Sequence, residues 1–96
     1  MKVRILDEAE QDLVEGFRFY ETREAGLGDY FLDSLFSDID SLCLYAGVHS
    51  VHFGYRRLLS KRFPFAIYYK VDSETASVWA VLDCRKDPAK IADRLK

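Results

Sequence analysis

Hydrophobic and polar positions alternate over the first six residues and then switch to a helical spacing. Val3 and Ile5 share one side of segment 2–6, which predicts a short strand with one buried face. Asp7 is predicted to cap the helix that follows, because its short acidic side chain can accept hydrogen bonds from free backbone amides. Two further acids in the first turn suit the positive end of that helix.

Two stretches with apolar residues three and four positions apart predict a helical hairpin. The stripe of the first helix consists of Ala9, Leu13, Phe17 and Tyr20, widened by Val14. The stripe of the second, from about Asp29, consists of Phe31, Leu35, Ile39 and Leu42, flanked by Leu32, Phe36 and Cys43, with Asp33, Ser37, Asp38 and Asp40 on the outward side. Gly26 and Gly28 separate the two helices, since glycine tolerates the backbone angles that end a helix.

The pattern changes to strands in the second half of the chain. Residues Tyr55 to Phe63 alternate with two mixed faces, which favours an edge strand or a strand whose outer face binds a partner. Pro64 belongs at a strand boundary, because proline cannot donate a ladder hydrogen bond. The runs 65–71 and 75–82 are β-prone and are separated by turn residues, so they predict a β-hairpin.

The last element is a short helix. Asp87 and Pro88 are typical of an N-cap followed by the first helical residue, and Ile91 and Leu95 share the apolar side. The predicted order is β-α-α-β-β-β-α in a single domain, residues 1–96. This order favours the α+β class: a small antiparallel sheet with an N-terminal helical hairpin packed on it.

Charge is divided unevenly along the chain. Residues 1–55 hold 4 basic and 11 acidic side chains, a net charge of −7, whereas residues 56–96 hold 10 basic and 5 acidic, a net charge of +5. A basic second half favours an anionic partner, and the alternative is a pair of charged faces that serve solubility alone. The start of the chain lacks the features of a signal peptide, and no apolar run is long enough for a membrane span, so a cytoplasmic location is expected.

Common catalytic and metal-binding patterns are missing. Cys43 and Cys84 have neither metal-ligand spacing nor a disulfide-rich context, which predicts reduced thiols. His49 and His52 are expected to be surface loop residues, because two imidazoles alone rarely hold zinc. No phosphate-binding glycine loop or nucleophile motif occurs, so we expect no metal and no cofactor.

The remaining candidate chemistry is a set of basic and aromatic residues on the predicted strands and their ends. Guanidinium and ammonium groups there could hold phosphates, with a tyrosine stacking on bases or packing on protein. A metal-independent ribonuclease could use such arginines together with a lysine or tyrosine for proton transfer. The alternative is a solvated face of charged side chains. The set comprises Arg56, Arg57, Lys61, Arg62, Lys70, Arg85 and Lys86, with Tyr68 and Tyr69.

The stretch RRLLSKRFPFAIYYKVDSETASVWAVLDCRKDP resembles the RelE/ParE superfamily of toxins from type II toxin–antitoxin systems, of the plasmid-stabilisation type. The matching features are Arg57, the run from Phe63 to Tyr69, the Ala80-Val81-Leu82 strand, and Arg85-Lys86-Asp87-Pro88. The resemblance implies a compact sheet with a helical hairpin and a cognate antitoxin that wraps the toxin. It also implies one of two activities: RelE-like members cleave mRNA in the ribosome, and ParE-like members poison DNA gyrase.

The residues of a RelE-like ribonuclease are mostly missing. The family's central-strand arginine falls at or near Ala66, whereas the arginine after the last strand matches Arg85. No tyrosine follows Tyr69, so the C-terminal tyrosine has no counterpart, and Asp83 stands where a histidine is often seen. The resemblance therefore favours a ParE-like toxin that does not cleave RNA.

Three functions follow from the resemblance. The first is growth inhibition by binding gyrase, the second is ribosome-dependent mRNA cleavage, and the third is a nontoxic member that only forms a complex. The expected partners are a cognate antitoxin and either gyrase or the ribosome with mRNA. The predicted target contacts are Arg57, Lys61, Arg62, Tyr69, Arg85 and Lys86, of which Arg57, Lys61, Arg62 and Arg85 would serve catalysis in a ribonuclease.

Overall fold

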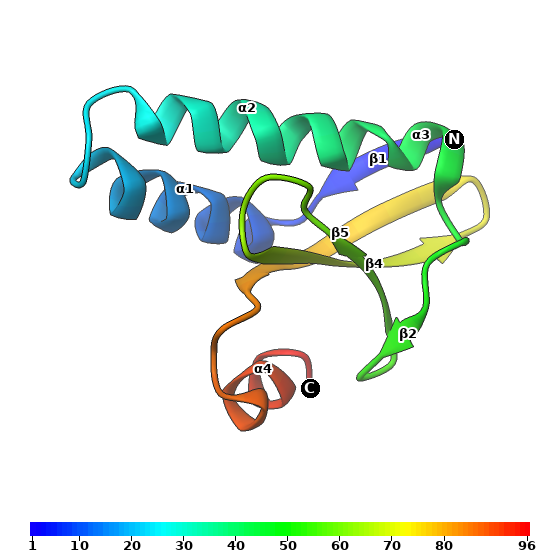
Figure 1. Ribbon diagram of the computed structural model, residues 1–96. Coiled ribbons are helices and arrows are strands. Elements are labelled where there is room, and N and C mark those ends of the chain that lie inside the picture. Colours follow the sequence, from blue (N-terminus) through cyan, green and yellow to red (C-terminus); the bar gives the residue numbers. More distant parts are fainter.

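The computed structural model describes residues 1–96 and has three layers: a helical hairpin, a sheet and a short C-terminal helix (Figure 1). The predicted order is confirmed, with two short additions, a one-turn helix and a two-residue strand, between the hairpin and the strand at Tyr55. The elements are β1 Lys2–Ile5, α1 Asp7–Glu21, α2 Leu27–Asp40, α3 Leu42–Tyr45, β2 Val51–His52, β3 Tyr55–Leu59, β4 Phe65–Asp72, β5 Thr75–Asp83 and α4 Pro88–Arg94.

The five strands form one sheet in the order β1-β5-β4-β3-β2. The α+β class with a hairpin on the sheet is confirmed. The sheet is mixed rather than wholly antiparallel, because β1 pairs in parallel with β5 while the other neighbours are antiparallel. Strands β2 to β5 follow one another through turns, which makes their pairing antiparallel, whereas the helical hairpin separates β1 from the rest and allows the parallel pairing.

Helices α1 and α2 cover one face of the sheet, and the larger core lies beneath them. Twelve buried residues form this core, supplied by both helices, by α3 and by the inward residues of β4 and β5. Phe31 is at its aromatic centre, with ring centroids 5.0 Å from Phe65 and 5.2 Å from Phe63. The predicted stripes are therefore confirmed as core at Leu13, Phe31 and the positions that follow it on α2, whereas Val14 and Phe36 are exposed.

Two glycines permit the close approach of the helices. A Cβ atom on Gly16 would overlap the ring of Phe31, and one on Gly28 would lie 2.7 Å from ring atoms of Phe17. Any larger residue at these positions would push the helices apart, because buried side chains are already closely packed. Between the helices, Gly26 has a φ angle of 90°, a conformation that glycine adopts without steric cost.

Helix α4 covers the opposite face of the sheet (Figure 1). Ile91 of α4 and Leu95, which caps its C-terminal end, join a second cluster of seven buried residues with side chains from β3, β4 and β5. The side chain of Asp87 accepts a hydrogen bond from the amide of Ala89, and Pro88 follows at the first helical position. The predicted N-cap and short C-terminal helix are thus confirmed.

Several local expectations differ from the structure. Asp7 lies inside α1 rather than capping it, since Leu6 occupies the cap position without a side-chain hydrogen bond. Strand β3 ends at Leu59, and residues 60–64 form the turn to β4, because that turn is fastened to α2 instead of continuing the ladder. Asp38, expected to point outward, is buried and accepts a hydrogen bond of 2.7 Å from the Ser60 hydroxyl. No helix combines the length and apolar character needed to cross a membrane.

Candidate functional site

Arg57 lies on the α4 side of the sheet. Strand β3 places it directly opposite Tyr68 of β4, and Tyr68 is a buried member of the cluster beneath α4. Burial raises the pKa of the Tyr68 phenol, and the positive charge of Arg57 opposes that rise. The Nε atom of Arg57 is buried and has no hydrogen-bond partner. Solvent does not reach this atom, so a binding partner would contact Arg57 through the exposed part of its half-buried side chain.

Cys84 lies close to Arg57 at the end of β5 but has little nucleophilic character. Desolvation by surrounding protein atoms raises the pKa of its thiol, and the charge of Arg57 only partly opposes this. The thiol is therefore protonated at neutral pH, and the thiolate is the reactive form. Cys43 and Cys84 are both free, as predicted.

Arg85 is engaged by a carboxylate of its own chain. Its Nε and Nη2 atoms lie 3.0 and 2.7 Å from the two carboxylate oxygens of Asp83, and its backbone amide donates to the same side chain. The hydrogen bonds from Arg85 lower the pKa of Asp83, and Asp83 in turn raises the pKa of Arg85. A phosphate at Arg85 would have to displace the Asp83 carboxylate.

The sheet separates Arg57 from the Arg85–Asp83 pair. Asp83 is opposite Phe65, a member of the core under the helical hairpin, whereas Arg57 is opposite Tyr68 on the α4 side. Directly paired residues project from the same face of a sheet. The two arginines that a ribonuclease would share are thus not brought together on one face.

Lys61 and Arg62 are exposed in the turn between β3 and β4. Asp38 of α2 holds this turn, accepting from the Ser60 hydroxyl and from the Lys61 amide. Phe63 follows this turn, and its ring centroid lies 4.9 Å from that of Tyr20. Tyr20 also interacts with the Arg85 guanidinium. Lys61, Arg62 and Arg85 therefore lie toward the same end of the sheet, on the hairpin side.

Lys86 is exposed and lines a cavity of about 250 Å³ between α1 and the end of β5. Three carboxylates share this cavity with it, those of Asp12, Glu15 and Asp83. The surroundings of Lys86 are therefore acidic, which makes them unfavourable for a phosphate backbone.

Tyr69 does not belong to the predicted contact surface. Its side chain is fully buried in the core under the helical hairpin, so the expectation that it touches a target is wrong for the folded chain. Its hydroxyl accepts a hydrogen bond of 2.9 Å from the Gly47 amide and also bonds Nδ1 of His49. His49, expected at the surface, is half-buried, and burial together with the charge of Arg56 lowers its pKa.

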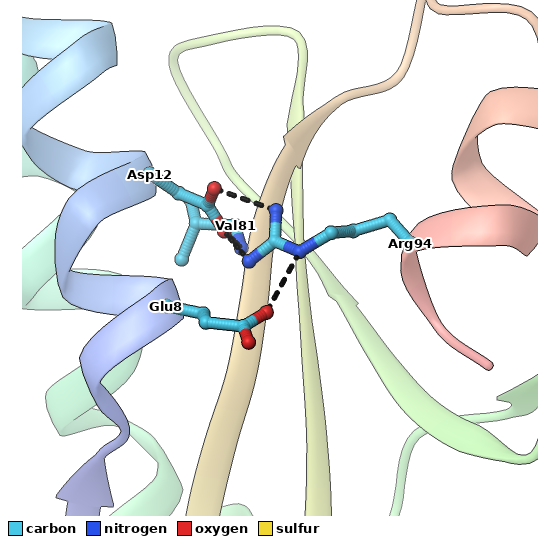
Figure 2. Close-up of polar contacts among 4 residues, drawn as sticks. All are labelled: Glu8, Asp12, Val81 and Arg94. Carbon is cyan, nitrogen blue, oxygen red and sulfur yellow. Dashed lines mark hydrogen bonds and ion pairs between the residues drawn. The ribbon is translucent and has the colours of Figure 1, made fainter.

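A polar cluster that the sequence did not reveal joins α4 to α1 (Figure 2). The guanidinium of Arg94 lies 2.7 and 2.8 Å from the carboxylate oxygens of Asp12 and 3.3 Å from Glu8. Asp12 is buried and also accepts a hydrogen bond of 3.0 Å from the amide of Val81 in β5. The hydrogen bonds with Asp12 raise the pKa of Arg94.

The position of Asp12 next to Leu13 in the apolar stripe was the only available signal for this cluster. No group of three or more histidine, cysteine or acidic side chains could hold a metal ion.

The outer side of the helical hairpin carries an apolar groove, hereafter the hairpin groove. It encloses about 340 Å³ between α1 and α2. Val14 and Phe36, two of the residues that line it, are exposed although they belong to the predicted apolar stripes of the helices. The groove is lined by Leu13, Val14, Phe17, Leu32 and Phe36, with Glu10 and Arg18 at its rim. Such a surface suits the apolar side of a partner helix.

Comparison with known proteins identifies a solved structure of similar fold. No family model matches the chain, and no curated protein matches its sequence. Among solved structures, the chain is similar to one from the "Chromosomal ParDE TA system from P. aeruginosa", with a TM-score of 0.70 and 17% sequence identity, covering 84% of this chain and 92% of that chain. The expected α+β architecture is confirmed at the level of the fold.

Proposed function

We propose that this chain is the toxin of a type II toxin–antitoxin pair, that it inhibits growth by binding DNA gyrase, and that a cognate antitoxin neutralises it. The main support is the similarity of its fold to a chain of a ParDE system over most of both chains. The resemblance of its second half to RelE/ParE toxins supports the same assignment independently of the structure.

The arrangement of the candidate residues favours gyrase over RNA as the target. Asp83 neutralises Arg85, and Arg57 is on the other face of the sheet. At the central-strand position where a RelE-like toxin has arginine, Ala66 is fully buried, with no room for a guanidinium. A ribonuclease needs its cations and its proton-transfer group around one phosphate, and these positions do not provide that.

A supercoiling assay with purified gyrase tests the target. The purified chain should inhibit supercoiling, and Arg57→Ala should weaken the inhibition, because it removes a partly exposed cation on the α4 side. Arg4→Ala is a matched control, an exposed arginine on β1 outside the predicted contacts. Undiminished supercoiling at saturating concentrations of the wild-type chain would refute gyrase as the target.

The second candidate is a ribosome-dependent mRNA endonuclease, and the exposed cations Lys61 and Arg62 are the observation in its favour. Primer-extension mapping of mRNA after induction of the chain distinguishes the two. Codon-phased cuts would support RNA cleavage, and their absence with intact translation would exclude it. Normal growth on induction without antitoxin would instead indicate the third alternative, a nontoxic complex-forming member.

We propose the hairpin groove as the antitoxin surface. Its apolar lining and its length along two helices fit an amphipathic antitoxin helix, which would supply most of the affinity through apolar anchors. The antitoxin to test is the product of any small gene found beside the one that encodes this chain. Val14→Asp should weaken its binding by more than about tenfold, the cost of placing a charge in an apolar contact. Equal affinity of the variant and the wild type would exclude the groove.

A further inference from the structure

Residues 41–55 contain no charged side chain, although 31% of the chain is charged. This segment, SLCLYAGVHSVHFGY, includes α3, β2 and the loop between them. In Figure 1 it runs along one edge of the molecule, from the end of the helical hairpin down to the edge strand β2. The chain's uneven charge distribution therefore has a neutral segment at the junction of its acidic and basic halves.

Large apolar side chains of this segment are exposed rather than packed. Leu44 is 81% exposed and Val48 is 73% exposed. With Tyr45, Val51 and Phe53 they form what we call the edge strip. Their summed exposed area is on the order of 600 Å², and contiguous apolar patches of that size generally mark interaction sites.

The edge strip is held in place by hydrogen bonds to the sheet. The Gly47 amide donates to the Tyr69 hydroxyl over 2.9 Å, and the Arg56 guanidinium donates to the His49 carbonyl over 2.8 Å. Below them, the amide of Arg57 donates to the carbonyl of Ser50 over 3.0 Å. An apolar surface that is already ordered loses little conformational entropy when it binds, which favours association.

We propose that the edge strip is a two-fold interface with a second copy of this chain. In a two-fold contact the same patch lies on both subunits, so a patch with one sign of charge would oppose like charges. No side chain of the edge strip is charged. The N-terminal ammonium, 3.5 Å from the Cys43 carbonyl, and the Arg56 guanidinium, at the His49 carbonyl, lie beside the strip, so the two-fold axis has to pass through the apolar side chains and away from these cations. The acidic outer side of α1 would repel its own copy. Homodimer interfaces are also more apolar than contacts between different proteins, as this strip is.

The size of the edge strip predicts a weak dimer. Stable interfaces bury about 800 Å² on each partner, somewhat more than the strip exposes. Area alone does not fix affinity, so we take a dissociation constant on the order of micromolar as the expectation for a contact of this small size. The hairpin groove shares no residue with the edge strip, so dimerisation is compatible with antitoxin binding there.

Sedimentation equilibrium of the full chain, from about 1 µM to about 200 µM, brackets that range. The mass should rise with concentration from 11.1 kDa toward twice that value. Leu44→Asp should weaken the dimer more than tenfold, because it buries two unpaired carboxylates at the contact. Leu59→Asp is the matched control: Leu59 is 52% exposed at the far end of β3, and its substitution should leave the dissociation constant unchanged.

Val48→Asp is the second variant, and far-UV circular dichroism and the urea midpoint verify that each variant is folded. A wild-type mass of one chain at every concentration would overturn the proposal. So would a dimer that persists in folded Leu44→Asp and Val48→Asp. A monomeric chain in which both variants abolish gyrase inhibition would assign the edge strip to the target protein instead. If the chain dimerises as expected but inhibits nothing, only the proposed toxin function fails.

Discussion

The two faces of the sheet are covered in different ways. The hairpin face carries two helices of 15 and 14 residues over a core of twelve buried side chains. The α4 face carries a helix of seven residues, and only Ile91 and Leu95 anchor its side of a seven-residue cluster. Because apolar burial is the main stabilising contribution, the hairpin face holds most of the folding free energy.

The contacts that hold the helices to the sheet also differ between the two faces. The hairpin face is closed by close aromatic packing around Phe31, whereas α4 depends on the Arg94 contacts with Asp12 and Glu8 (Figure 2). Segments with few buried apolar contacts open at a lower free energy than the global unfolding reaction. Helix α4 is therefore expected to open before the hairpin, with Arg94 controlling how readily it does so.

Equal deletions on the two faces should have unequal effects. Leu35→Ala removes a fully buried side chain under the hairpin and should lower the free energy of unfolding by about 3–5 kcal/mol. Leu95→Ala removes the same atoms at the end of α4, which can collapse or fray, and should cost about 1–2 kcal/mol. Urea unfolding measures both values. Equal losses would show that α4 is as integral to the core as the hairpin.

The Arg94 contacts should contribute less than the apolar core. Arg94→Ala leaves the buried Asp12 carboxylate with only the Val81 amide, so we expect a loss of about 1–2 kcal/mol, less than for a fully buried pair because Arg94 is partly exposed. Hydrogen exchange should accelerate in α4 far more than in α2. Lys96→Ala is the control, since its pair with Asp93 is exposed. Uniform acceleration across both helices would contradict a separately opening α4.

Most elements were predictable because the signals that specify them are local in sequence. Apolar residues three and four positions apart determine both helices, and the Asp87-Pro88 pair marks the start of α4. The β4–β5 hairpin follows from two β-prone runs and the turn between them. In each case the residues that carry the signal are close in sequence and act on the same element.

Residues whose partners are distant in sequence were not predictable. Asp38 was expected on the solvated side of its helix, but it binds Ser60, 22 positions away. Asp12, for which the sequence offered no partner, binds Arg94, 82 positions away. Tyr69 was expected at the surface, because the alternation of residues along β4 does not reveal which face of the strand the helical hairpin covers. The parallel pairing of β1 depends likewise on how the whole chain closes.

A polar contact on the hairpin face should make stability depend on pH. The Tyr69 hydroxyl accepts from Gly47, so its proton is free for Nδ1 of a neutral His49. The pKa of His49 is lowered on folding, so the unfolded chain binds more protons between the two pKa values and stability falls as pH drops through the folded one.

Urea unfolding of the wild type and His49→Gln at about pH 7.5 and about pH 5, on either side of the usual histidine value, measures this effect. The wild type should lose more stability than the variant over that interval. The difference between the two losses should be smaller than the stability that Arg94→Ala costs. An identical loss in both proteins would mean that other groups cause the dependence.

The smallest effect on stability is expected at the Arg85–Asp83 pair. Arg85 is 62% exposed on its side chain, and exposed ion pairs contribute about 0–1 kcal/mol, so Arg85→Ala should shift the urea midpoint little. Whether the chain inhibits gyrase or cleaves mRNA, we expect Arg85→Ala to inhibit growth less than the wild type. A reduced growth effect with unchanged stability would assign Arg85 to target contact, because loss of folding could not explain it. Full growth inhibition would remove Arg85 from the contact surface and leave Arg57, on the other face, as the main candidate.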